Sequence, residues 1–332
     1  MYYRYKAKKK NKKRYKQLFL ILVFSGIILL GYRYSQYLLF WKYTFNNLHN
    51  KVCEIENISD PRVRRERLSK LYKICKEYKG EKQVSSDAFL LSGKVSFNLG
   101  KTYFPGTFTD IIINENWENI GIRAKKEFIR CVKDIRKGIS LRKDNNIGIE
   151  YILMLAKAYF YTDYRDIKAI YEIINKIEDV AALKSLSDIR FFAIINIMSM
   201  NENYGFEFLH KYGKSFDNLK GCLFLAIAYK IAKRYTSSIM EYKNILEKVS
   251  DDEIVKVVHK NLGEIYYRQT LYKESLFHYK NAYKFDRDNN LLKIGIGKNY
   301  YAMGYKSKAL AIWNEVLMSD SSNMEIRGLL AQ

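Results

Sequence analysis

The chain has 332 residues and a formal net charge of +23, a balance that invites a nucleic-acid hypothesis. Ten of the positive charges belong to the first 33 residues. The remaining +13 is spread along the chain without an RNA-binding fingerprint or a helix-turn-helix pattern, which argues against nucleic acid as a partner. Four scattered cysteines without a CxxC pair exclude a zinc site of the usual spacing.

Residues 1–16 carry nine Lys or Arg and no acid, which predicts a solvated basic tail. The uncharged stretch 17–32 is short for a bilayer at about 1.5 Å per residue. It reaches across if the helix continues to Trp41 with Arg33 snorkelling, so we expect residues 17–41 to form a transmembrane anchor and its interfacial continuation. The alternatives are a cleavable signal peptide, for which Ser25 and Gly31 offer poor cleavage sites, and a soluble helix.

The charges that flank the apolar stretch predict its orientation. Nine Lys or Arg precede it, and only Arg33, Lys42 and Lys51 follow within a similar distance. Positive flanks stay in the cytoplasm. We therefore expect a single-pass membrane protein with a cytoplasmic N-terminus and an extracytoplasmic C-terminal domain, which would be periplasmic in a bacterium.

Residues 42–84 read as a helical hairpin in which Asp60 caps a helix that begins at Pro61. The outward basic face of that helix is either solvated or in contact with anionic lipid. Its residues are Arg62, Arg64, Arg65, Arg67, Lys70, Lys73, Lys76 and Lys79.

Residues 85–148 read as a degenerate repeat with helices at 86–101 and 121–141, separated by an insertion at 102–117. Pro105 and Gly106 break the first helix, and 110–114 looks more strand-like than helical. The insertion is either a binding face or a tolerated long turn.

The clearest pattern lies between Lys256 and Asn323, where one unit is written twice at a 34-residue period. Residues at i, i+3, i+4 and i+7 predict two antiparallel helices per unit that approach each other at small side chains. Neither helical hairpin can bury its row of apolar residues alone, so neighbouring hairpins must stack on each other. The matching pairs are Leu262 and Ile296, Gly263 and Gly297, Tyr266 and Tyr300, Ser275 and Ala309, Tyr279 and Trp313, and Ala282 and Val316.

These residues resemble the tetratricopeptide repeat (TPR), whose pattern is aromatic-x2-Leu-Gly-x2-Tyr followed by Ala-x3-Phe. The closing Pro of that pattern is absent, with Arg287 and Ser321 in its place. Ser250 and Ser322, each with Glu three residues on, predict capping boxes. The resemblance implies an all-α, TPR-like α-solenoid of stacked helical hairpins over 149–332, ending in a capping helix. Together with the apolar stretch, this places the solenoid behind an N-terminal transmembrane helix. Its repeats would be 149–183, 186–218, 219–252, 256–289 and 290–323.

In this family the first helices line a groove, which here would be mixed basic and apolar and would suit an extended or helical peptide with acidic and hydrophobic side chains. Tyr267 and Tyr301 are the expected anchors. The candidate partner-binding residues are Lys230, Lys260, Glu264, Tyr267, Lys298 and Tyr301. The other groove positions expected to be exposed are Leu153, Lys157, Phe160, Arg190, Ile194, Leu223, Ile227 and Ile294.

The sequence lacks common catalytic and nucleotide-binding motifs: it has no HExxH, GxSxG, Walker loop or dinucleotide fingerprint. Its four histidines do not have the spacing of a metal-binding pair. Cys53 and Cys75 would stand at different heights on their hairpin, which predicts free thiols. We therefore expect no catalytic residue, no cofactor and no metal.

The expected function is a membrane-anchored TPR scaffold or chaperone-like adaptor that binds protein or peptide partners in envelope assembly or secretion. The alternatives are a regulatory module for a cell-wall or proteolytic enzyme, and binding of anionic lipid or polymer.

Overall fold

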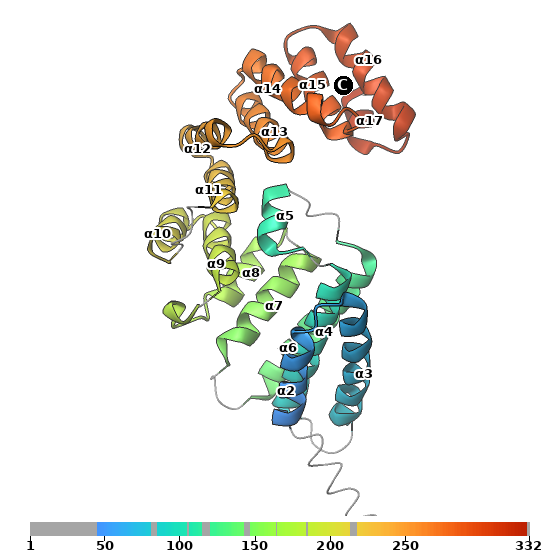
Figure 1. Ribbon diagram of the computed structural model, residues 1–332, viewed down its shortest axis with the longest axis vertical. Coiled ribbons are helices and arrows are strands. Elements are labelled where there is room, and N and C mark those ends of the chain that lie inside the picture. Colours follow the sequence, from blue (N-terminus) through green and yellow to red (C-terminus); the bar gives the residue numbers. More distant parts are fainter. Residues whose placement is uncertain are drawn as a thin grey trace, which may run out of the picture. The chain divides into compact units, whose positions relative to one another are not determined.

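The computed structural model describes residues 45–80, 85–104, 106–114, 120–142, 147–163, 165–183, 185–212 and 218–330 (Figure 1). Within these ranges all regular structure is helical, which confirms the all-α class. The basic tail and the expected anchor 17–41 lie outside the described residues. Among the described helices, none is long and apolar enough to cross a membrane. Packing divides the chain into two units. Unit 1 comprises the residues up to Tyr103 together with Lys126–Ile147, and unit 2 comprises Phe104–Lys125 and Gly148 onward.

Unit 1 contains α2 (Phe45–Glu56), α3 (Pro61–Gly80), α4 (Ser86–Tyr103) and most of α6 (Ile122–Leu141). The predicted start of α3 is confirmed: Arg62 N donates to Asp60 Oδ1 at 2.7 Å, and Pro61 occupies the first helical position. Helices α2 and α3 pack on α4 through fully buried aliphatic side chains. This apolar cluster includes Leu48, Val52, Leu68, Leu71, Leu91 and Val95.

Helices α4 and α6 match the two predicted at 86–101 and 121–141, and they pack closely because α4 presents small residues. A Cβ added at Gly100 would lie 2.6 Å from the ring of Phe128. Ser92 Oγ donates to Asp134 Oδ2 at 2.6 Å, and Ser86 Oγ donates to the carbonyl oxygen of Gly138 at 2.7 Å. With the bond from Arg142 NH2 to Asp87 Oδ1 at 3.2 Å, three side-chain hydrogen bonds join the described halves of the degenerate repeat.

The expectation of strand-like structure at 110–114 is wrong, since α5 (Phe108–Asn114) is a helix. Thr107 and Asp110 form a capping box in which Asp110 N donates to Thr107 Oγ1 at 3.1 Å and Thr107 N donates to Asp110 Oδ2 at 3.0 Å. Burial of Ile111 and Ile112 then outweighs their preference for strands, because that preference depends on packing context.

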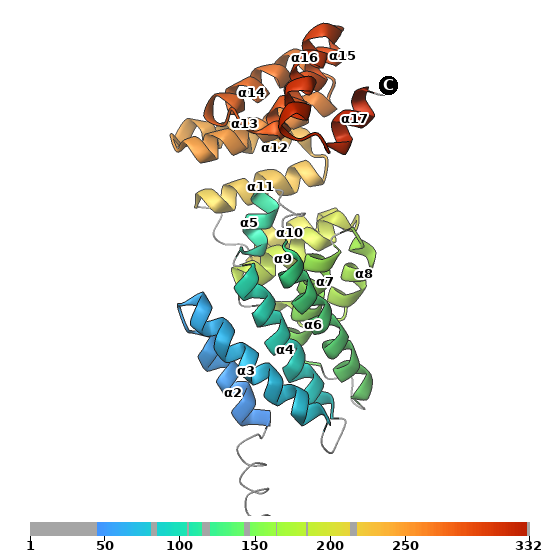
Figure 2. The same cartoon turned by 90° about the vertical axis from the view of Figure 1, so that its right-hand side faces the viewer.

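Besides α5 and the first turn of α6, the described part of unit 2 contains five antiparallel helix pairs and a final helix, in the order predicted from the repeats (Figure 2). A 3₁₀ turn at Val180–Ala182 follows the first pair. The pairs are α7 (Ile149–Thr162) with α8 (Ile167–Ile174), α9 (Leu186–Met198) with α10 (Glu202–Tyr212), α11 (Leu219–Ile231) with α12 (Tyr235–Lys248), α13 (Asp252–Arg268) with α14 (Tyr272–Phe285), and α15 (Asn290–Ala302) with α16 (Lys306–Ser319), followed by α17 (Met324–Leu330).

The same hydrogen bond recurs where the two helices of a pair cross. Ser238 Oγ donates to the carbonyl oxygen of Ala226, and Ser275 Oγ donates to that of Gly263, each at 2.7 Å. All four residues are buried. A larger side chain at any of them would separate the helices, so the small residues of the sequence pattern set the spacing of each pair.

Asp and Asn side chains close the turns that lack the family's proline. Asn289 Oδ1 accepts from Leu291 N at 3.0 Å at the start of α15, and Asp320 Oδ1 accepts from Ser322 N at 3.2 Å in the turn before α17. The capping residues predicted at Ser250 and Ser322 are wrong by one position. Asp251 caps α13, accepting from Ile254 N, and Asn323 caps α17, accepting from Ile326 N, each at 3.1 Å. In each case the side chain one residue later reaches the third helical amide.

We predict that Gly263→Ala destabilises the fold by about 1–3 kcal/mol, because the added Cβ would lie 2.8 Å from Tyr279 Cδ2 in a packed core. Gly328→Ala in α17 is the matched control, since its Cβ would meet nothing within 4 Å. The control should be neutral or stabilising by up to about 1 kcal/mol. Urea unfolding followed by circular dichroism measures both, and equal effects would contradict the close approach.

Candidate protein-binding surface

The first helices of the five pairs, α7, α9, α11, α13 and α15, form what we call the first-helix face. Six of its fourteen predicted groove positions are half-buried: Lys157, Lys260, Glu264, Tyr267, Lys298 and Tyr301. The expectation that the other eight are exposed is wrong. The buried ones are Leu153, Phe160, Arg190, Ile194, Leu223, Ile227, Lys230 and Ile294.

Helix α5 explains much of this burial, because it packs against α9 and α11 within unit 2, as both Figure 1 and Figure 2 show. The Phe108 ring stands edge-on to Phe160 on α7 and Phe191 on α9, with centroids 5.1 and 4.9 Å away. Phe108 is 1% exposed. Part of the insertion therefore packs on the first-helix face and is not a loose turn.

A polar contact accompanies this apolar packing. Lys220 Nζ, in the first turn of α11, lies 3.4 Å from Asp110 Oδ1. Partial burial raises the pKa of Asp110, but the hydrogen bonds from Thr107 and the charge of Lys220 outweigh it, so the pKa is lowered overall. The carboxylate thus remains charged beside its lysine, and α5 presents both apolar and acidic side chains to the face that it covers.

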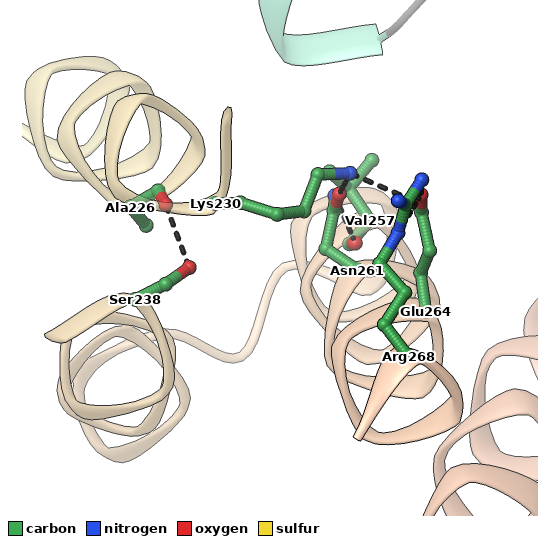
Figure 3. A network of polar contacts seen from close by, with 7 residues as sticks. All are labelled: Ala226, Lys230, Ser238, Val257, Asn261, Glu264 and Arg268. Carbon is green, nitrogen blue, oxygen red and sulfur yellow. Dashed lines mark hydrogen bonds and ion pairs between the residues drawn. The ribbon is translucent and has the colours of Figure 1, made fainter. Parts of the chain in front are cut away.

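Lys230 on α11 is at the centre of a network that joins two neighbouring pairs (Figure 3). Its Nζ donates to Asn261 Oδ1 at 2.6 Å and to Glu264 Oε2 at 2.8 Å. Arg268 NH2 donates to the other oxygen of Glu264 at 2.8 Å. Lys230 is only 8% exposed. This predicted partner contact is therefore buried and committed to an internal bridge between α11 and α13.

Glu264 is ionised because of these partners. Burial alone would raise the pKa of its carboxyl group, but the charges and hydrogen bonds of Lys230 and Arg268 outweigh burial and lower the pKa to about 2. The side chain of Arg268 is 55% exposed, so one cation of the network faces solvent. Sequence reasoning missed Arg268, although its i+4 spacing from Glu264 was a usable signal.

The remaining candidates lie on α13 and α15, beyond the helices that contact α5. Tyr301 packs on Trp313 with centroids 5.6 Å apart, and Tyr267 packs on Tyr272 at 5.5 Å. The two tyrosines are one 34-residue period apart and remain half-buried. Lys298 forms an ion pair with Glu325, which fastens the final helix α17 to α15. The open part of the first-helix face is thus formed by Lys260, Tyr267 and Tyr301, with Arg268 beside them.

Two histidines whose spacing in the sequence predicted no contact are in contact in the fold. His259 Nδ1 and His278 Nδ1 are 2.8 Å apart, so one ring donates to the other. Burial lowers the pKa of both, that of His278 to about 4, which keeps the pair neutral at neutral pH.

No group of three or more His, Cys, Asp or Glu that could hold a metal ion occurs among the described residues. All four cysteines lie in described helices and carry thiols rather than disulfides.

Comparison with known proteins places the fold. No family model and no curated protein matches the chain. A solved tetratricopeptide repeat protein from Parabacteroides merdae aligns over 86% of this chain and 97% of its own, with 14% identity and a TM-score of 0.54. The Cut9-Hcn1 hetero-tetramer of the APC/C aligns over 86% of this chain and 51% of its own, with 13% identity and a TM-score of 0.42, which is too low to compare folds. The first structure shows that the fold is a TPR-like α-solenoid.

We expect the lowered pKa of Glu264 to make stability depend on acid. The unfolded chain binds a proton near pH 4.5 and the folded chain only near pH 2, so the stability that Glu264 contributes is present above about pH 4.5 and is lost as pH falls toward 2. Glu264→Gln should lose less free energy of unfolding than the wild type over this window. Urea titrations at several pH values measure the difference. The control Glu247→Gln, at an exposed carboxylate on α12, should follow the wild type.

Phe108→Ala should destabilise unit 2 by about 3–5 kcal/mol, because the ring is 1% exposed and fills the space between Phe160 and Phe191. Phe277→Ala on α14 is the matched control, since this ring is 62% exposed and its loss should change stability by less than about 0.5 kcal/mol. Chemical denaturation measures both. A small effect at Phe108 would show that α5 does not pack on the first-helix face.

Proposed function

We propose that this chain is a protein-interaction scaffold whose open first-helix face, on α13 and α15, binds a peptide segment with apolar and acidic side chains. The observation that carries the proposal is the packing of α5 on α9 and α11, because it is an example within the molecule of a short segment bound to this face. A TPR-like fold is consistent with a role in protein interaction, although the site itself must supply the specificity.

The chemistry of α5 defines the class of partner. Phe108, Ile111 and Ile112 supply the buried apolar contacts, and Asp110 meets Lys220. A partner helix on α13 and α15 would meet a comparable combination of aromatic side chains and cations. Tyr267 and Tyr301 offer rings that are already held by neighbouring aromatics, which reduces the entropy lost on binding. The exposed guanidinium of Arg268 favours carboxylates.

The proposal includes a location. Residues 17–41 anchor the chain in a membrane as a single span, and the nine Lys or Arg before them keep the N-terminus in the cytoplasm. The solenoid then works on the far side of the membrane, as an adaptor in envelope assembly or secretion. What supports this location is the uncharged run 17–32 and the charge difference between its flanks.

Site-specific crosslinking tests the binding face. A photoreactive amino acid at Tyr267 or at Tyr301 should trap the same partner in native membranes, because the two positions are one repeat apart on one face. The same probe at Met240 or Phe277, which are 57% and 62% exposed on second helices, should trap none. Addition of Tyr301→Ala to the Tyr267 probe should reduce the yield. Equal yields from both sets of positions would contradict binding at this face.

A further inference from the structure

Helix α6 carries an exposed stripe of three lysines and one isoleucine. We call the residues Lys126, Ile129, Lys133 and Lys137 the α6 outer face. Successive spacings of three, four and four residues place them on one side of the helix. All four are exposed. This part of α6 lies in unit 1, together with α2, α3 and α4.

The acids of α6 point away from this stripe. Glu127 is 9% exposed and accepts from Arg130 at 2.7 Å, and Asp134 is 7% exposed and accepts from Ser92 at 2.6 Å. Since these two are the helix's acidic residues, the α6 outer face carries one sign of charge. Three lysines within twelve residues therefore create a locally positive field.

Two exposed isoleucines distinguish this face from a helix face that only contacts water. Ile129 stands among the cations and is 57% exposed, and Ile122, seven residues earlier on the same side of α6, is 88% exposed. A partner that presents only phosphates would leave such side chains in water. An anionic bilayer surface accepts both, because the isoleucines enter the boundary of the acyl chains while the lysines reach the headgroups.

Helix α3, the alternative basic surface, is partly occupied by internal contacts. Arg64 Nε donates to the carbonyl oxygen of Ile58 at 2.8 Å, Arg65 NH2 donates to that of Thr102 at 2.7 Å, and Lys70 pairs with Glu66 at 2.6 Å. These contacts hold three of its eight predicted outward cations. What favours the α6 outer face as the contact with an anionic surface is the exposed Ile129 among its lysines.

We propose that the α6 outer face lies on the anionic phospholipid headgroups of the membrane that holds residues 17–41, an inference that rests on the proposed anchor. The distance along the chain supports it. Helix α2 of the same unit begins at Phe45, four residues after Trp41. Four extended residues reach no more than about 15 Å, so unit 1 stays close to the bilayer. Near an anionic membrane each Lys or Arg strengthens association about fivefold.

Lysine acetylation of the full chain in vesicles tests the contact. Labelling of Lys126, Lys133 and Lys137 should fall several-fold in phosphatidylglycerol-containing vesicles relative to pure phosphatidylcholine, and high salt should restore it. Lys243 and Lys273, exposed on the second helices α12 and α14, should label equally in both. Ile129→Asp should abolish the protection, whereas Met240→Asp should retain it, because the two side chains are each 57% exposed and neither is needed for the core.

The inference would be overturned if the α6 lysines were labelled to the same extent in both kinds of vesicle, whether that extent is high or low. Protection by a DNA oligonucleotide that exceeds protection by anionic vesicles would overturn it in favour of nucleic acid. Flotation with phosphatidylcholine vesicles tests the anchor separately, because residues 17–41 should hold the chain there whatever residue stands at 129. A chain that fails to float while anionic vesicles still protect α6 would remove the anchor and keep the lipid contact.

Discussion

The close approach of paired helices at small residues is the constraint on which the solenoid depends. Ser238 and Ser275 each donate from a second helix to a backbone carbonyl of the first helix, across a contact that leaves no room for a larger side chain. The hydrogen bond satisfies the buried hydroxyl. Small residues also leave room for Tyr279 to pack against Gly263 of its own pair and Gly295 of the next, and for Trp313 to pack against Gly297 of its own pair. Because each pair is built in the same way, neighbouring pairs stack on each other.

Stacking leaves the first-helix face as the side that can receive other segments, and the chain uses part of it internally. Helix α5 covers α9 and α11 with Phe108 and two isoleucines, and the Lys230 network closes the junction between α11 and α13. What remains open is the aromatic and cationic surface of α13 and α15. The molecule thus divides one face into a part that α5 fills, which adds to the core, and a part on α13 and α15 where we propose that a partner binds.

Local pattern determined much of the fold. The helices around Gly263 and Gly297 followed from a 34-residue repeat of small and aromatic residues, and the start of α3 followed from Asp60 and Pro61, because these signals act within one or two turns of chain. The caps of α13 and α17 were misplaced by one residue, since Ser and Asp or Asn stood side by side and only backbone geometry selects between them.

The sequence by itself determined the all-α class, the positions of the repeats and the excess of positive charge. Tertiary structure alone decided which groove positions are exposed. The sequence predicts that Lys230 is exposed, whereas in the fold Asn261 and Glu264 of the next pair bind it. The sequence also predicts strand-like structure at 110–114, whereas these residues form a helix that packs on α9 and α11. The physical reason is that helical periodicity is set by neighbours in the chain, whereas burial and ion pairing are set by residues that only the packed fold brings together.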